Sequence, residues 1–292
     1  MNSKVILLIV SLCLAAIAGM RAQGYSFHVE KSGSGDPVIL IPGLSSSGEV
    51  WNETVARLWA DYECHVLTLP GFAGQPPLDP LPDDYLGAVR EEILRYIAEE
   101  GLERPIVIGH SLGGFLGIAL AVEEPGLLRK LLIVDALPFL AGIQAPAMTE
   151  AVARSMAANM KERVLNQSPE QYEQAQPAIL ASMINDKDDI ATALQWGRDS
   201  DQATVAQAMY DLYASDLREE LAGVEIPILV LGAWIAYEQW GATRESTLAR
   251  YEAQYAKAPN CTIRLTDKGK HFIMWDDPDF YFEQLHQVLL EQ

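Results

Sequence analysis

Basic residues and cysteines are scarce in this chain. Its 292 residues include 21 Lys plus Arg against 40 Asp plus Glu, which gives a formal net charge of −19. A surface of that sign repels phosphate backbones and anionic lipid headgroups, so the composition disfavours nucleic-acid binding and peripheral membrane binding. Three cysteines are too few for a disulfide scaffold, and 49% hydrophobic residues are too many for a disordered chain. A globular protein that binds small neutral or cationic molecules remains open.

Metal-binding and dinucleotide-binding patterns are also missing. No H-x-x-H, C-x-x-C or H-E-x-x-H spacing occurs in the sequence. The segment Gly33-Ser34-Gly35 precedes a predicted strand rather than following one, so it does not match the glycine-rich loop of a dinucleotide site. We therefore expect neither a metal ion nor an organic cofactor.

A single long apolar run stands at the N-terminus. Lys4 gives a short positive start, and the segment 5–18 is almost wholly apolar. Such a run is shorter than the ~20 residues that span a bilayer, and the small residues Ala16 and Ala18 fit a signal-peptidase site. We predict a signal peptide over 1–22, cleaved after Ala18 or Ala22, and hence a periplasmic or extracellular protein with no stable membrane span after cleavage. An uncleaved membrane anchor is the alternative.

Strand-like and helical patterns alternate along the rest of the chain. Short β-branched runs occur at 37–41, 64–69, 105–108, 131–134, 226–231 and 261–265, with a polar edge strand at 25–31. Continuous apolar runs indicate burial on both faces, which favours an α/β fold with a mostly parallel sheet between layers of helices. About 90 residues between 135 and 226 show helical patterns alone. We predict a core in two parts, 23–136 and 226–292, and a helical lid over 137–225.

The candidate nucleophile lies in Gly109-His110-Ser111-Leu112-Gly113. The predicted strand 105–108 leads into this segment and a helix of small residues leads out of it. That order is typical of a nucleophile elbow, in which a strained turn holds the serine hydroxyl clear of the sheet. A helix-capping serine in an ordinary strand–helix loop is the alternative.

Five motifs together resemble the α/β-hydrolase superfamily. They are Ile41-Pro42-Gly43-Leu44, the segment 69–74, the serine motif with Gly114, Val134-Asp135-Ala136, and Lys270-His271-Phe272. The resemblance implies an α/β-hydrolase fold, with a mostly parallel eight-stranded sheet, helices on both faces and a helical lid inserted after the sixth strand. It also implies that Cys64 and Cys261 lie on distant strands, too far apart for a disulfide.

A serine nucleophile needs a base within hydrogen-bond reach. We predict His271 for this role, because it follows the last strand in a loop, and open α/β sheets gather their catalytic groups at the carboxyl ends of strands. The remaining histidines fit structural or exposed positions better; they are His28, His65, His110 and His286.

The acid that orients the base departs from the superfamily pattern. The resemblance places an aspartate shortly after the strand at 226–231, but the segment 231–239 contains Glu238 as its sole carboxylate. We predict Asp135, at the end of the preceding strand, as the acid. Glu238 is the alternative, and a third possibility is that neither serves.

Backbone N–H groups of Leu44 and Leu112 are predicted to form the oxyanion hole, although Pro42 stands where many relatives have His. The whole pattern predicts a secreted serine hydrolase that cleaves a carboxylic ester, or a related acyl bond, of a small-molecule acyl substrate. A lactonase, an amidase or aminopeptidase-like enzyme, a carbon–carbon bond hydrolase and a non-catalytic binding module are the alternatives. Ser111 excludes the epoxide hydrolases and haloalkane dehalogenases, which use a carboxylate at this position.

Overall fold

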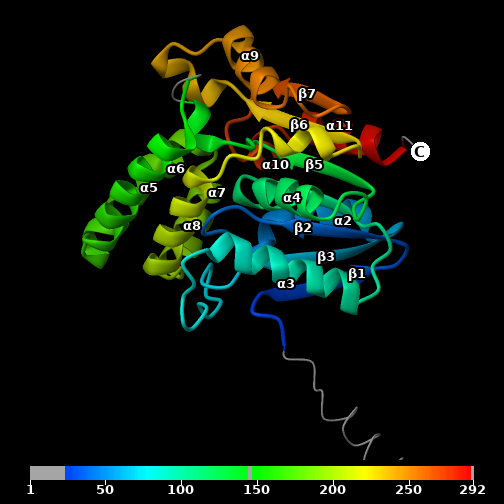
Figure 1. Cartoon of the computed structure of the whole chain (residues 1–292), viewed down its shortest axis with the longest axis horizontal. Helices are drawn as coiled ribbons and strands as arrows, with labels where there is room; N and C mark the ends of the chain where they lie inside the picture. The colour runs from blue at the N-terminus through cyan, green and yellow to red at the C-terminus, as the bar shows by residue number, and fades with distance from the viewer. Residues whose placement is uncertain (1–23, 144–146, 291–292) are drawn as a thin grey trace, which may run out of the picture.

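A computed structural model describes residues 24–143 and 147–290 of the chain, so the predicted signal peptide at 1–22 lies outside the described residues. At the centre is a seven-stranded sheet with the strand order β1-β3-β2-β4-β5-β6-β7 (Figure 1). Its strands are β1 (His28–Gly33), β2 (Asp36–Ile41), β3 (Tyr62–Thr68), β4 (Ile106–His110), β5 (Lys130–Val134), β6 (Ile228–Ala233) and β7 (Cys261–Thr266). Only β1 runs antiparallel to its neighbour; the other pairs are parallel.

The sheet has one strand fewer than the superfamily resemblance implies. Strand β1 is already the edge, and its charged side chains are exposed, as suits an unpaired edge. The residues before it contact helix α3 (Tyr85–Glu99). Ser26 N donates to Glu92 Oε1 at 3.0 Å, and the Tyr25 hydroxyl donates to Glu99 Oε2 at 2.6 Å. Within the described residues, the helical insertion therefore follows the fifth strand, β5, rather than a sixth.

Alternate residues of each inner strand pack against different layers of helices. Along β2, Ile39 and Ile41 contribute to one hydrophobic cluster, while Val38 and Leu40 contribute to the other. Strands β4, β5 and β6 are buried along their whole length. Helices α3 (Tyr85–Glu99), α4 (Leu112–Glu123) and α9 (Arg244–Gln254) cover the first face, and α2 (Asn52–Leu58), α10 (Ile273–Asp276) and α11 (Pro278–Leu290) cover the second (Figure 1).

Four helices occupy the interval between β5 and β6 and lie beside the sheet in Figure 1. They are α5 (Glu150–Leu165), α6 (Pro169–Met183), α7 (Lys187–Arg198) and α8 (Gln202–Ala214). Each begins at a capping side chain, from Thr149, Ser168, Asp186 or Asp201. We call these four helices the lid. Short 3-10 segments complete the chain: η1 (Gly48–Trp51), η2 (Leu140–Ile143), η3 (Glu220–Gly223) and η4 (Ile235–Trp240).

Cys64 lies on β3 and Cys261 on β7, with four strands between them in the sheet, and both thiols are free. The distance expected between these cysteines is therefore confirmed. Over the two described ranges, no helix combines the length and apolar character needed to cross a bilayer.

Candidate active site

Ser111 occupies a strained turn between β4 and α4. Its backbone has φ 53° and ψ −118°, a region that residues other than glycine rarely adopt. Two backbone hydrogen bonds hold the turn: Ser111 N donates to Val134 O at 2.9 Å, and Phe115 N donates to Ser111 O at 3.0 Å. The Ser111 side chain makes no capping hydrogen bond to α4. Its hydroxyl is therefore not used as a helix cap, contrary to the alternative reading of the motif.

Two glycines allow the strand and the helix to cross closely at this turn. A Cβ atom on Gly109 would lie 2.3 Å from the carbonyl oxygen of Gly113. A Cβ atom on Gly113 would lie 2.2 Å from the carbonyl oxygen of Ile41. Both distances are far shorter than a normal contact, so any larger residue would push α4 away from the sheet and displace Ser111.

His271 and Asp135 are in direct contact. The Nδ1 atom of His271 lies 2.6 Å from Oδ2 of Asp135, whose side chain is only 2% exposed. The other carboxylate oxygen, Oδ1, accepts hydrogen bonds from Ala233 N at 2.8 Å and from the Tyr251 hydroxyl at 2.5 Å. An ionised carboxylate can only accept, so Nδ1 of His271 donates the proton in this contact. Nε2 is then left as the basic nitrogen of the ring.

The backbone of Asp135 is also held in a defined conformation. Asp135 has φ 51°, a left-handed conformation that aspartate tolerates better than most residues. Its N–H donates to Leu231 O at 2.7 Å, which extends the pairing of β5 with β6 by one residue. The carboxylate is therefore held by two neighbouring strands at their carboxyl ends, where the predicted catalytic groups are expected to meet.

Two tyrosines, one buried and one partly buried, lie near Asp135. Burial raises the pKa of Tyr251 well above its usual value, and the charge of Asp135 adds to this effect. The same two causes, in the same order, raise the pKa of Tyr237. Both phenols therefore remain protonated donors at neutral pH. Sequence reasoning missed Tyr251, because it lies on α9, 116 residues from Asp135, in a segment without a recognisable motif.

Glu238, the alternative acid, lies elsewhere. It is on η4 with an exposed side chain, and no hydrogen bond or ion pair among the described residues joins it to His271. The strand β6 ends at Ala233, whose N–H is already bonded to Asp135. The structure thus brings Asp135, rather than Glu238, to the imidazole of His271.

The environments of the other four histidines do not suit a catalytic base. His110 is fully buried, and this burial together with the neighbouring His271 lowers its pKa well below the usual value. Its Nε2 lies 3.1 Å from the carbonyl oxygen of His271, so the neutral ring donates to the backbone of His271. His65 is buried on β3 against Tyr96, whereas His28 and His286 have exposed side chains.

The residues of the two predicted oxyanion donors lie next to the serine or next to Gly43, which lies close to it. Leu112 is the first residue of α4, so its N–H has no acceptor within the helix and points out of its positive end. Leu44 follows Gly43, where a Cβ atom would lie 3.2 Å from Cβ of Ser111. The loop after β2 therefore passes directly beside the serine, and Pro42 does not prevent this approach.

A side chain of the lid lies close to the same loop. Tyr172 of α6 lies near Ser45, the residue that follows Leu44, and burial raises the pKa of Tyr172. Ser45 itself has φ 54°. Tyr172 also lines a groove of about 230 Å³ between α6 and α7, near Leu194 and Arg198. Tyr172 thus lies between this groove and the loop after β2 that carries Leu44.

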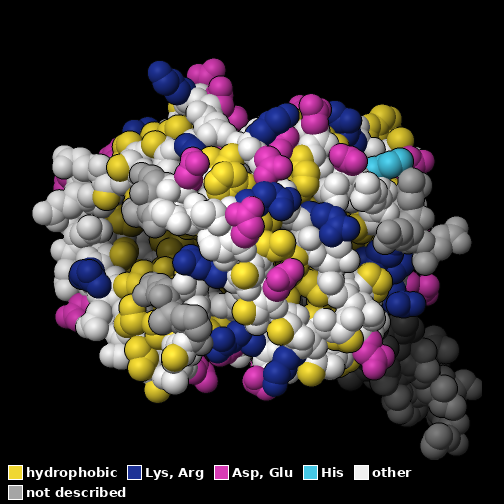
Figure 2. Space-filling view, turned by 90° about the horizontal axis from the view of Figure 1, so that it is seen from above, with side chains coloured by type: hydrophobic (Ala, Val, Ile, Leu, Met, Phe, Trp, Pro, Cys, Tyr) yellow, Lys and Arg dark blue, Asp and Glu magenta, His cyan; other side chains and the backbone are white. Residues whose placement is uncertain are grey.

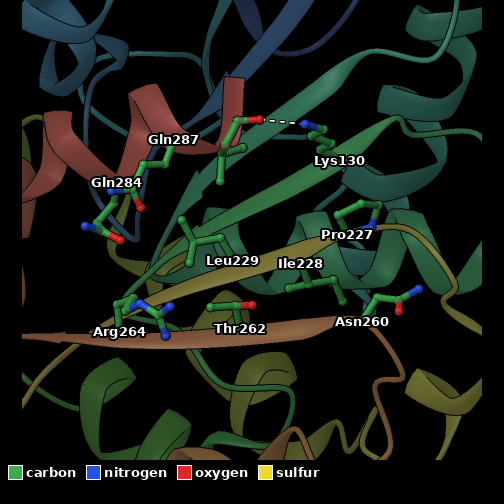
Figure 3. Close-up of a pocket in the computed structure, with 10 residues that line it drawn as sticks. Lys130, Pro227, Ile228, Leu229, Asn260, Thr262, Arg264, Gln284 and Gln287 are labelled. Carbon is green, nitrogen blue, oxygen red and sulfur yellow. Dashed lines mark hydrogen bonds between the residues drawn. The ribbon is translucent and has the colours of Figure 1, made fainter. Parts of the chain in front are cut away.

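A second cavity lies near the amino-terminal ends of the strands, away from Ser111. It has a volume of about 130 Å³, and Figure 3 shows Ile228, Leu229 and Thr262 among the residues that line it. These residues belong to the amino-terminal halves of β6 and β7, whereas Asp135 and His271 follow the carboxyl ends of their strands. Lys130 Nζ donates to the Val288 carbonyl there at 2.6 Å, as the dashed line in Figure 3 shows. This cavity cannot hold a substrate of Ser111.

Other kinds of site find little support. In the described part of the chain, no group of three or more His, Cys, Asp and Glu side chains is arranged to hold a metal ion. On the face shown in Figure 2, Lys and Arg side chains are interspersed with acidic and apolar ones rather than gathered into one patch. The carboxyl edge of the sheet, with Ser111, Asp135 and His271, is therefore the candidate active site.

Comparisons with known proteins agree with this fold. Residues 38–284 match the model of the alpha/beta hydrolase family. A proposed carbamate hydrolase, RutD, from Pseudomonas syringae pv. syringae strain B728a is 28% identical over 265 residues, which cover 87% of this chain and 93% of the relative. A pimeloyl-[acyl-carrier protein] methyl ester esterase from Aeromonas hydrophila is 28% identical over 212 residues, covering 70% of this chain and 78% of the relative.

A crystal structure of a hydrolase from Pseudomonas aeruginosa PA01 superimposes with a TM-score of 0.73 at 16% identity, covering 92% of this chain and 96% of that one. The family match spans both parts of the core and the lid between them. The chain belongs to the alpha/beta hydrolase family.

Proposed function

We propose that this protein is a secreted serine hydrolase that cleaves a carboxylic ester of a small-molecule acyl substrate. The observation that carries the proposal is the 2.6 Å contact between His271 Nδ1 and Asp135 Oδ2. It lies at the same edge of the sheet as the strained turn of Ser111, whose N–H is bonded to the residue before Asp135. A nucleophile, a base and an orienting acid thus come from the ends of β4, β7 and β5.

The proposed reaction begins with attack of Ser111 Oγ on the ester carbonyl carbon. His271 Nε2 accepts the hydroxyl proton, and Asp135 stabilises the imidazolium that results. The N–H groups of Leu44 and Leu112 hold the negative oxygen of the tetrahedral intermediate. His271 then gives the proton to the departing alkoxide, which leaves as an alcohol, and water hydrolyses the acyl-enzyme by the same steps.

The relatives support hydrolysis at a carbonyl carbon, and one of them supports an ester as the substrate. The one from Aeromonas hydrophila is named as a methyl ester esterase, and the one from Pseudomonas syringae as a proposed carbamate hydrolase. Both names describe hydrolysis at a carbonyl carbon, which is the chemistry that a serine, a histidine and an oxyanion hole perform. The secreted part of the proposal rests on the apolar segment 5–18 and the small residues Ala16 and Ala18 at its end.

A fluorophosphonate probe tests the nucleophile. We expect it to label Ser111 in the wild-type protein and to leave Ser111→Ala unlabelled. Absence of labelling in folded wild-type protein would favour a non-catalytic binding module instead. A panel of p-nitrophenyl esters of increasing acyl length, measured beside a p-nitroanilide and a lactone, then tests the bond. Turnover of the anilide or the lactone without turnover of any ester would overturn the ester assignment.

A further inference from the structure

The C-terminal end of lid helix α6 is bonded to the loop that carries His271. Phe272 N, directly after His271, donates to Met183 O at 3.3 Å. On the other side of His271, Asn185 Nδ2 donates to Lys268 O at 3.1 Å. Helix α6 and the loop that joins it to α7 therefore contact the backbone on both sides of the histidine.

Lys270 adds a charged contact to this junction. Its Nζ donates to Ala181 O at 2.8 Å and to Ile184 O at 3.2 Å. The last carbonyls of a helix lack intrahelical donors and carry partial negative charge, so a cation at this position satisfies them and is stabilised by the helix dipole. The residue next to His271 thus caps the helix that ends the first half of the lid.

Asp276 bridges the same two segments from the core side. Its Oδ1 accepts from Asn185 N at 2.9 Å, and its Oδ2 accepts from Lys270 N at 2.8 Å. One carboxylate on α10 thus ties Asn185, two residues beyond the end of α6, to the residue before His271. Burial raises the pKa of Asp276, and the two backbone donors oppose this shift.

We propose that Lys270, Asn185 and Asp276 form a clamp through which the lid positions His271. Asp135 fixes the ring of His271, and His110 fixes its carbonyl oxygen, but both act from the core. The clamp fixes the flanking backbone from the lid side. A displacement of this end of the lid would therefore displace the base as well. The inference rests on the proposed function, because it requires His271 to be the base.

Lys270→Met tests the clamp, because it removes the charged cap and keeps the length of the side chain. We expect kcat to fall about 10- to 100-fold, since small displacements of a catalytic group cost that much, while KM changes by no more than about threefold. Lys270→Arg retains donors for the two carbonyls and should recover most of kcat. Lys187→Met is the matched control: it removes an exposed lysine at the start of α7, close to the same junction, and should leave both constants unchanged.

The rate of fluorophosphonate labelling separates the possible failures. If wild-type Ser111 is not labelled, the proposed function fails. If Ser111 is labelled at the wild-type rate in folded Lys270→Met, the clamp is refuted and the function stands. Equal losses of kcat in Lys270→Met and Lys187→Met, or no recovery in Lys270→Arg, would also refute the clamp. Should Lys270→Met not fold, Asn185→Ala removes a more exposed contact of the clamp, and an unchanged kcat in that variant would count against it.

Discussion

The Tyr251 hydroxyl donates a 2.5 Å hydrogen bond to Oδ1 of Asp135, the carboxylate oxygen that His271 does not use. Tyr251 is buried on α9, a helix that carries none of the sequence motifs. The orientation of the acid therefore depends on a helix from the last fifth of the chain. Oδ1 accepts two hydrogen bonds and Oδ2 contacts His271, so together these contacts fix the orientation of the carboxylate.

Tyr251→Phe should therefore weaken both the fold and the reaction. We expect the free energy of unfolding to fall by about 1–3 kcal/mol, because a buried acceptor loses a donor. Because the carboxylate is held less firmly, we expect kcat to fall about 3- to 10-fold, a barrier change of roughly 1 kcal/mol. Tyr255→Phe is the control: its buried hydroxyl donates to Ala136 O at 2.8 Å rather than to the acid. Equal kcat values in the two variants would contradict a role of Tyr251 in orienting Asp135.

Asp135→Asn should lower kcat by roughly 10²–10⁴ without unfolding the protein, as loss of the orienting acid does in serine proteases. An amide that donates to His271 favours the wrong tautomer, so Nε2 no longer accepts the serine proton. Glu238→Gln should remain close to wild type, because the Glu238 side chain is exposed. The measurement is kcat on a p-nitrophenyl ester, with circular dichroism to confirm folding. A crippled Glu238→Gln beside a near-normal Asp135→Asn would reverse the assignment.

Asp211 should make the stability of the protein depend on pH. This residue of α8 accepts from Tyr85 N at 2.8 Å and Leu86 N at 3.1 Å at the start of α3, and burial raises its pKa from 3.8 to about 6. A carboxyl whose pKa is raised by folding stabilises the folded state below its unfolded pKa. That contribution is lost as the pH rises through the folded pKa, here about 6.

Urea denaturation of Asp211→Asn and wild type between about pH 5 and 7 measures this contribution. We expect the free energy of unfolding of the variant, relative to wild type, to rise by about 1 kcal/mol over that range, since one unit of pKa shift corresponds to about 1.4 kcal/mol. Asp279→Asn, which removes an exposed carboxyl on α11, should show no such trend. A constant difference between Asp211→Asn and wild type would show that Asp211 does not titrate there.

Processing at the N-terminus is open to a direct measurement. Cells that express the full gene should hold outside the cytoplasm, or release, a protein that begins at Gly19 or Gln23, because a signal peptide over 1–22 is removed on export. N-terminal sequencing of the periplasmic and extracellular fractions identifies the first residue. Cytosolic material that retains Met1 would refute export.

The sequence indicated those parts of the site that lie in local patterns. Ser111 stands in a strand–turn–helix motif, and both His271 and Asp135 follow a run of β-branched residues that predicted a strand. Tyr251, Lys270 and Asn185 could not be assigned in this way. Their roles depend on how α6, α9 and the loop after β7 pack together, and no local pattern encodes such contacts. The expected eighth strand came from the family resemblance, whereas the described residues form seven strands, and Tyr25 and Ser26, just before β1, bond to α3.

The lid begins and ends on neighbouring strands, because β5 pairs directly with β6. Insertions of different length can therefore be exchanged at this point without disturbing the order of the sheet. The contacts of Lys270 restrict such exchanges, because a new insertion would also have to offer it the carbonyl end of a helix. A change of lid that alters the substrate range would then also alter the position of the base. Lid chimeras that lack a helix end for Lys270 would lose turnover even when their pockets fit the substrate.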